Sequence, residues 1–208
     1  MKLFRLPLAG LLASALLVIA AEKDAWIYPF KGDSLGTWTA PDPSEWAVKD
    51  GVLTGKGARS HLFSPDTHTN VEIITEVKLN HSGNSGIYFR TQLGKGFPKG
   101  YETQVENTSP DPQKTGSLYN LSKVSEQLIQ DDTWWTQHVI AIGNRTIIQI
   151  NGKTVTDFVD EKKTHTSGHL ALQQHDDKSV VQFRNYHYRP LPDDEAAALK
   201  LAGIAAKK

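Results

Sequence analysis

The sequence predicts an all-β protein, a sandwich or jelly roll built from antiparallel strands. Short segments of alternating apolar and polar residues recur along the chain, and turn-forming residues separate them roughly every 8–12 residues. Two of these turns, Asp50-Gly51 and Asn151-Gly152, are dipeptides typical of tight β-hairpins. Beyond its N-terminal segment, the chain has the length of one large β domain.

The strands follow from the residues in chain order. Residues 24–50, rich in Trp, Pro, Gly and Asp, are expected to form an edge strand and loops that cover a core. Residues 71–80 alternate over a full strand length, and a cluster of Gly, Ser and Asn then turns the chain. The predicted hairpin and strands are 46–53, 71–80, 84–92, 101–107, 134–142, 146–150, 153–158, 168–175 and 179–188.

The C-terminus is the segment that reads as a helix. Pro192-Asp193-Asp194-Glu195 places acidic side chains at a helix start, where they face the positive end of the helix dipole, and an Ala-rich run to Ala206 follows. We therefore divide the mature chain into a β-sandwich domain, residues 25–191, and a helical tail, residues 192–208. The tail is expected to be a frayed appendage.

The N-terminus resembles a signal for export. Lys2 and Arg5 precede an apolar run over residues 6–19, and Ala20-Ala21 supply small residues for cleavage. The run is shorter than the roughly 20 residues that span a bilayer. Residues 1–21 are thus interpreted as a cleaved signal peptide, which predicts a periplasmic or secreted protein that is not held in a membrane. The absence of cysteine fits a bacterial periplasm or exterior.

The net charge of the chain limits the class of ligand that it is expected to bind. The chain has 23 Lys and Arg residues against 23 Asp and Glu residues, a net charge of zero. Nucleic-acid binding requires a basic surface, so this balance argues against it and suits a neutral ligand. The sequence makes no prediction of oligomeric state.

Alternation along the strands indicates where a ligand could bind. Successive side chains of a strand point to opposite faces, so each strong strand has one apolar and one polar face. The polar faces are expected to hold Glu72, Glu76 and Lys78; Tyr88, Arg90 and Gln92; Glu102, Gln104 and Glu106; Gln173 and His175; and Gln182, Arg184, Tyr186 and Tyr188. If these faces adjoin, one sheet surface collects the residue types that bind and stack on sugars. Taken singly, each could be a solvated amide, a loop histidine or a surface ion pair of little energetic value.

Five ordered motifs resemble the 3-keto-disaccharide hydrolase family across residues 25–191. The motifs are Asn84–Arg90, Tyr101–Val105, Gly116–Tyr119, Leu172–His175 and Phe183–Asn185. The resemblance implies a concanavalin A-like jelly roll, export from bacteria and a carbohydrate ligand oxidised at C3. One departure is Trp134-Trp135-Thr136, where many members carry Trp-Asn, and we interpret it as structural variation.

The chemistry of a 3-keto-glycoside assigns candidate roles. The keto group acidifies the C2 hydrogen, so a base can remove it, the enolate can expel the C1 substituent, and water can then add. Glu102 or Glu76 is the candidate base, His175 a second acid or base, and Arg90 and Arg184 the groups that stabilise the enolate oxygen. The candidate substrate-binding residues are Asn84, Ser85, Tyr88, Gln104, Tyr119, Gln173 and Arg184.

Three alternatives stay open from the sequence, one of which is a structural protein of the cell envelope. A conventional glycosidase would use two carboxylates. A non-catalytic, lectin-like carbohydrate-binding module could use the same fold, because fold does not fix function. We expect no cofactor and no metal site, although enolate chemistry is compatible with a divalent metal; His165 and His169 lie four residues apart but not on a helix.

Overall fold

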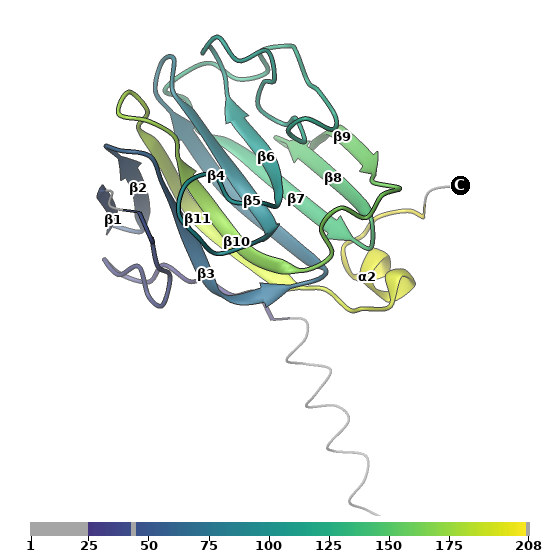
Figure 1. The fold of residues 1–208 in the computed structure, drawn as a ribbon. Helices are drawn as coiled ribbons and strands as arrows, with labels where there is room; N and C mark the ends of the chain where they lie inside the picture. Colours follow the sequence, from purple (N-terminus) through teal and green to yellow (C-terminus); the bar gives the residue numbers. More distant parts are fainter. Residues whose placement is uncertain (1–24, 43–44, 207–208) are drawn as a thin grey trace, which may run out of the picture.

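The structure, a computed structural model, describes residues 25–42 and 45–206 and is a sandwich of two antiparallel sheets (Figure 1). The seven-stranded sheet has the order β1-β2-β11-β4-β7-β8-β9, and the four-stranded sheet has the order β3-β10-β5-β6. The predicted all-β sandwich is confirmed. The signal peptide predicted over residues 1–21 lies outside the described residues.

The strand bounds follow the predicted ones closely. The strands are β1 Glu45–Lys49, β2 Val52–Lys56, β3 Ser60–His68, β4 Val71–Leu79, β5 Asn84–Thr91, β6 Tyr101–Glu106, β7 Trp135–Ile142, β8 Arg145–Ile150, β9 Lys153–Val159, β10 Gly168–Gln174 and β11 Val181–Pro190. Both predicted tight turns are confirmed: Asp50-Gly51 joins β1 to β2 and Asn151-Gly152 joins β8 to β9, all four residues having positive φ. Positive φ at both turn positions matches the twist of the paired strands.

Strand β3 was not predicted, and its sequence shows why. It contains Pro65 and lacks a regular alternation of apolar and polar residues. Proline cannot donate a ladder hydrogen bond, so it is tolerated at a sheet edge, which is where β3 lies. The strand pairs with β10, with His61 opposite Gln173.

The core fills the space between the two sheets. From the seven-stranded sheet it takes alternate residues such as Ile73, Val77 and Phe183, and from the four-stranded sheet Ile87 and Leu172, all fully buried. The outer face of the four-stranded sheet is therefore the opposite set of its residues, and this face carries the site described below.

A bulge in β11 changes the side on which two tyrosines lie. The register against β4 shifts between Arg184 and His187, where Asn185 has φ 51°. An extra residue at a bulge moves the following side chains to the other face. Tyr186 and Tyr188 consequently enter the core, so the prediction that they share the polar face with Arg184 is wrong.

The C-terminal helix α2, Glu195–Leu201, begins at the predicted acidic segment, with the Asp194 carboxylate accepting from the Ala197 N–H. Its buried residues Ala198 and Leu199 pack with Ile140 of β7 and Ile147 of β8 at the seven-stranded sheet (Figure 1). Burial of this apolar face stabilises the helix in place. The expectation of a frayed appendage is wrong for these residues.

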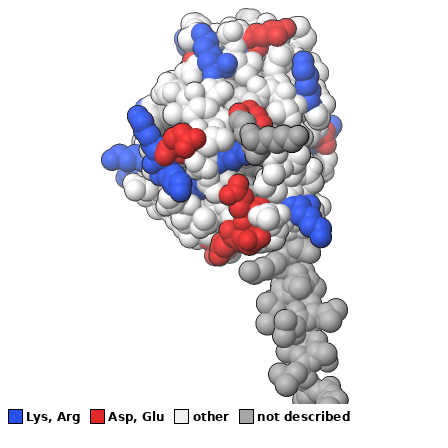
Figure 2. Space-filling model, turned by 90° about the vertical axis from the view of Figure 1, so that its right-hand side faces the viewer, with Lys and Arg blue, Asp and Glu red and all other residues white. Residues whose placement is uncertain are grey.

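Two surface properties complete the fold. On the side seen in Figure 2, acidic and basic side chains are interspersed among uncharged ones, as a net charge of zero leads one to expect. None of the helices within the described ranges is long and apolar enough to cross a membrane.

Candidate active site

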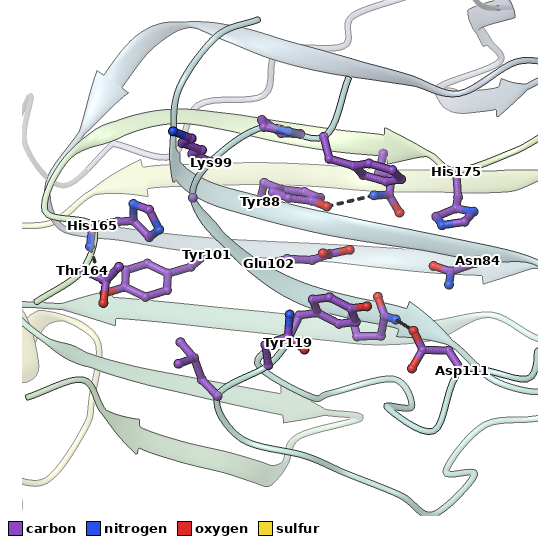
Figure 3. Close-up of a pocket in the computed structure, with 17 residues that line it drawn as sticks. Asn84, Tyr88, Lys99, Tyr101, Glu102, Asp111, Tyr119, Thr164, His165 and His175 are labelled. Atoms are coloured by element: carbon purple, nitrogen blue, oxygen red, sulfur yellow. Dashed lines mark hydrogen bonds between the residues drawn. The ribbon is translucent and has the colours of Figure 1, made fainter. Parts of the chain in front are cut away.

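A cavity of about 500 Å³ opens on the outer face of the four-stranded sheet (Figure 3). Its volume suits a ligand of one to two sugar rings. Its floor comes from β5, β6 and the end of β10, and its walls come from loops. The lining residues are Asn84, Tyr88, Phe97, Pro98, Lys99, Gly100, Tyr101, Glu102, Gln104, Asp111, Tyr119, Asn120, Leu121, Thr164, His165, Gln173 and His175.

Glu102 lies at the centre of this floor, between Tyr88 and Tyr119 (Figure 3). Tyr88 is its direct cross-strand partner, and Gly86 leaves the space over which the carboxylate extends: a Cβ at Gly86 would lie 2.3 Å from Glu102 Oε1. No ion pair of Glu102 is found within the described part of the chain. The glycine of the Asn84-Ser85-Gly86 motif thus serves the placement of Glu102.

The surroundings of Glu102 favour its protonated form. Burial raises the pKa of this carboxyl to about 7, and the negative charge of Asp111 acts in the same direction, whereas hydrogen bonding with Tyr88 opposes the rise. A carboxyl with a pKa near neutrality can both accept and donate a proton at physiological pH, as a general base or acid requires.

Behind Tyr88 runs a short chain of buried polar groups. Gln173 Nε2 donates to Tyr88 Oη at 2.8 Å and lies 3.2 Å from Nε2 of His61. Burial lowers the pKa of His61 to about 4, so the ring is neutral and its Nε2 can accept from the amide. With its oxygen occupied by this N–H donor, the Tyr88 hydroxyl is left to donate toward Glu102. His61 was not among the predicted site residues because strand β3, which carries it, was not predicted.

A second polar group borders Glu102 on its other side. The Asp111 carboxylate accepts from the Gln113 backbone N–H at 2.8 Å and from Gln104 Nε2 at 3.4 Å. With the Gln104 amide turned over, its nitrogen instead lies 3.2 Å from Glu102 Oε1. Burial and, to a smaller extent, the charge of Asp111 raise the pKa of Tyr119, which keeps that hydroxyl protonated as a donor. The signal for Asp111 was its place in the Pro-rich loop after β6.

His175 lies at one end of the cavity and is oriented by its neighbour. Its Nδ1 is 3.2 Å from Asp176 Oδ2, while Asp176 Oδ1 accepts from Ser179 Oγ at 2.8 Å and from the Lys178 N–H. These bonds lower the pKa of Asp176, opposing the effect of its burial. A carboxylate at Nδ1 leaves Nε2 of the imidazole for a ligand.

The opposite end of the cavity is built on Tyr101. Its hydroxyl donates to Asp160 Oδ2 at 2.6 Å and accepts from the backbone N–H of His165 at 3.2 Å. The His165 ring packs edge-on against Tyr101, and burial lowers its pKa. A second histidine thus faces the cavity, from a loop whose sequence carried no signal beyond the His itself.

Arg90 does not line the cavity. It has φ 50°, beside an irregularity in the pairing of β5 with β10, and its guanidinium turns away to donate to the carbonyl of Thr69 at 2.6 Å and that of His165 at 3.3 Å. A non-glycine residue in the left-handed region breaks the strand alternation on which the prediction rested. Arg90 fixes a loop of the site instead of facing a ligand.

Glu76 and Arg184 lie on the other sheet. They are cross-strand partners on β4 and β11, joined by an Arg184 Nε to Glu76 Oε2 bond of 2.9 Å on the outer face of the seven-stranded sheet. The expectation of one polar surface shared by five strands is wrong, because β4 and β11 belong to one sheet and β5, β6 and β10 to the other.

Ser85 and Glu106 also lie apart from the cavity lining. Ser85 is fully buried and donates to the Gln173 carbonyl at 2.6 Å, so it supports the floor from beneath. Glu106 pairs with Lys114 at 2.8 Å. The cavity does collect seven of the predicted residues: Asn84, Tyr88, Glu102, Gln104, Tyr119, Gln173 and His175.

A comparison with protein families matches residues 25–189 to the 3-keto-alpha-glucoside-1,2-lyase-like domain. The chain belongs to this family. The predicted family resemblance is therefore confirmed, and the cavity is the place where residues of its motifs converge. A search of curated proteins found no match.

Solved structures show the fold of this family member to be widespread among carbohydrate-related proteins. A protein of Parabacteroides distasonis described as a candidate glycosyl hydrolase is 23% identical, with a TM-score of 0.70 over 80% of this chain and 94% of its own. The β-glucanase of Bacillus licheniformis is 13% identical, with a TM-score of 0.58 over 81% and 98%. Carbohydrate-binding module CBM66 of Bacillus subtilis is 14% identical, with a TM-score of 0.54 over 73% and 94%. These similarities confirm the concanavalin A-like jelly roll.

Proposed function

We propose that this protein cleaves 3-keto-glycosides by removing the C2 proton and eliminating the C1 substituent, with Glu102 as the base. The observation that carries the proposal is a carboxylate without a cationic partner among the described residues, at the floor of a sugar-sized cavity, whose pKa lies at about 7. Family membership supplies the expectation of a 3-keto sugar.

In the first step, the ionised Glu102 takes the C2 proton, and the electrons of the C–H bond pass to the C3 carbonyl oxygen as an enolate. In the second, the enolate re-forms the ketone, a C1–C2 double bond forms, and the C1–O bond breaks. The leaving oxygen takes a proton from an acid. Addition of water across the double bond would complete a net hydrolysis.

The enolate oxygen needs hydrogen-bond donors, and the cavity offers a tyrosine hydroxyl where the sequence suggested arginines. Tyr119 flanks Glu102, and burial raises the pKa of its hydroxyl, which stays protonated as a donor, whereas the Tyr88 hydroxyl on the other side donates toward Glu102 itself. Among the described residues that line the cavity, Lys99 is the only lysine or arginine. Donors aimed at a developing oxyanion in a partly enclosed cavity stabilise it strongly. Arg90 and Arg184 drop out of this role because neither faces the cavity.

We assign proton donation to the leaving oxygen to His175. The imidazole faces the cavity and Asp176 holds its Nδ1, which leaves Nε2 directed to the ligand as the atom that passes a proton to the leaving oxygen. Asn84, Gln104 and Gln173 remain to bind sugar hydroxyls. We further propose that the reaction requires no cofactor, because it transfers protons without net oxidation; dialysis against EDTA should leave the rate unchanged, and loss of activity restored by a divalent cation would refute this.

A carbohydrate-binding protein without catalysis is the competing function, and the tyrosines and amides of the cavity would serve it. A binding site gains nothing from a carboxyl held near its point of ionisation, since neutral hydroxyls need no proton transfer. This difference in chemistry, together with family membership, favours the enzyme.

The test is incubation with a 3-keto-glucoside and with its unoxidised parent. The proposal predicts release of the aglycone from the keto form alone, and release abolished by Glu102→Gln. Binding of both compounds without turnover would establish the binding protein instead. We also propose export, from the segment over residues 1–21; cell fractionation that finds the full-length, uncleaved chain in the cytoplasm would refute it.

A further inference from the structure

We propose that the His175 end of the cavity is a leaving-group subsite, with Phe97 as its platform, and that it favours an aromatic aglycone over a second sugar. This inference rests on the proposed function and deepens it by naming a substrate class. Three features of the structure lead to it: an exposed aromatic ring at the cavity, a rigid loop beneath that ring, and a proton donor beside it.

Phe97 is an apolar side chain that the fold leaves open toward the cavity. It lines the cavity with 55% of its surface exposed, the largest exposed fraction among the large hydrophobic residues of the described structure. Its ring is held by the Arg59 guanidinium at 4.5 Å and by the rings of His61 and His175, with centroids 6.0 and 5.8 Å away. Pro98 adds a second apolar surface to the same wall.

The loop that carries Phe97 is anchored on both sides. The Gly96 N–H donates to Asp42 Oδ2 at 2.7 Å, and the Lys99 carbonyl accepts from the Thr91 hydroxyl and the Gln92 N–H, each at 2.9 Å. At Gly100 a Cβ would lie 2.5 Å from Thr91 Cβ, so the loop closes tightly against β5. A ring held in place before binding loses little freedom when a ligand stacks on it.

The position of His175 indicates which part of the substrate meets Phe97. If His175 protonates the leaving oxygen, that oxygen contacts the imidazole, and the aglycone bonded to it must lie beside the imidazole. Phe97 is the aromatic neighbour of His175 among the lining residues. Aromatic rings attract one another at centroid separations of about 4.5–7 Å. A second sugar would instead bring several hydroxyls to a wall formed by Phe97 and Pro98, whose side chains offer them no hydrogen-bond partner.

Leu121 provides a matched control. It is also apolar, exposed and part of the lining, but it follows Tyr119, whose N–H bonds the Glu102 carbonyl along the outer edge of β6. Phe97 contacts His61 of β3, at the other edge of the four-stranded sheet. The two apolar side chains therefore border the cavity from opposite sides of Glu102.

The experiment compares two 3-keto-glucosides of the same anomer, one with a 4-nitrophenyl leaving group and one with glucose, in the wild type, Phe97→Ala and Leu121→Ala. Comparing each variant with the wild type on one substrate cancels the intrinsic reactivity of the leaving group. Phe97→Ala should lower kcat/KM about tenfold for the nitrophenyl substrate and less than about twofold for the disaccharide. Leu121→Ala should affect both substrates equally. Equal losses for both substrates in Phe97→Ala, or no loss in either, would overturn the subsite.

Failure of the proposed function can be distinguished from failure of the subsite by the activity of the wild type. If the wild type cleaves neither keto substrate, that function fails, and calorimetric binding of 4-nitrophenyl glucoside and methyl glucoside then tests the platform alone. The subsite predicts tighter binding of the aryl compound and loss of that advantage in Phe97→Ala only. Equal binding of the two glucosides by the wild type would refute it.

Discussion

The two outer faces of the sandwich treat their glutamates in opposite ways. On the seven-stranded sheet, Glu76 bonds Arg184, and Glu72 bonds Arg189 at 2.7 Å and His138 at 2.8 Å. Burial is the largest single effect on the pKa of Glu72 and raises it, but the hydrogen bonds and charges of His138 and Arg189 together outweigh burial, so the pKa lies below the usual range. The pKa of Glu76 is lowered mainly by its hydrogen bond with Arg184. On the four-stranded sheet, burial raises the pKa of Glu102 to about 7.

The difference shows that partners, more than residue type or strand position, separate a structural carboxylate from a chemically competent one. All three glutamates occupy polar positions of alternating strands, and the alternation alone does not distinguish them. A paired carboxylate is a poor base because its charge is already satisfied, whereas a desolvated one gains by taking a proton.

The largest difference between the two faces is expected in the effect of a Glu→Gln substitution on kcat. Glu102→Gln removes the base and should lower kcat by about 10³-fold on a 3-keto-glycoside, with a small effect on KM. Glu76→Gln, a change of the same chemistry on the other face, should stay within about twofold of the wild type. Steady-state kinetics decide the matter, and similar losses in the two variants would remove the distinction between the faces.

The next effect concerns the buried ion pair. Arg189→Met leaves Glu72, only 3% exposed, without its guanidinium, and should lower the free energy of unfolding by about 3–5 kcal/mol in urea titrations. The double variant Glu72→Gln with Arg189→Met should recover part of this loss, since no buried charge remains. A loss below about 1 kcal/mol in the single variant would show that Glu72 does not depend on its partner.

Glu102 should destabilise the fold at alkaline pH. Its pKa rises from an ordinary 4.5 to about 7 on folding, so stability is lost as pH rises from 4.5 through 7. Removing the charge by Glu102→Gln should therefore raise the free energy of unfolding by up to about 3 kcal/mol at pH 8, and by much less at pH 4. An identical change at both pH values would mean that the carboxyl is not perturbed.

The smallest effect is expected at the exposed pair. The Arg184 side chain is 40% exposed and that of Glu76 is 27% exposed, so solvent screens their attraction. Arg184→Met should change the free energy of unfolding by less than about 1 kcal/mol, well below the effect of Arg189→Met. Urea titrations giving equal losses for the two arginines would show that burial does not rank these pairs.

Local patterns predicted much of this molecule, and departures from them account for the rest. Asp50-Gly51 and Asn151-Gly152 placed two hairpins, and the alternation of 101–107 placed Glu102 opposite the core. The single positive-φ residues Arg90 and Asn185 then moved side chains to faces that no period-two pattern could predict.

The assignment of strands to the two sheets is the second feature that the local patterns did not predict. Alternation says which residues of a strand share a face, but long-range pairing decides which strands are neighbours, and it separated Glu76 from Glu102. The same limit hid His61, since Pro65 disguised the edge strand that carries it. The five family motifs contain all seven predicted residues that line the cavity, but they also contain Ser85, Arg90 and Arg184, which do not line it.

The role of Glu102 as the base depends most directly on the pKa of its carboxyl. It can be measured by following the side-chain carboxyl ¹³C resonance from pH 3 to pH 9, with the signal assigned by its absence in Glu102→Gln. We expect a midpoint near 7. A midpoint at or below 4.5 would show an ordinary solvated carboxylate, and would contradict the assignment of Glu102 as a base made competent by its surroundings.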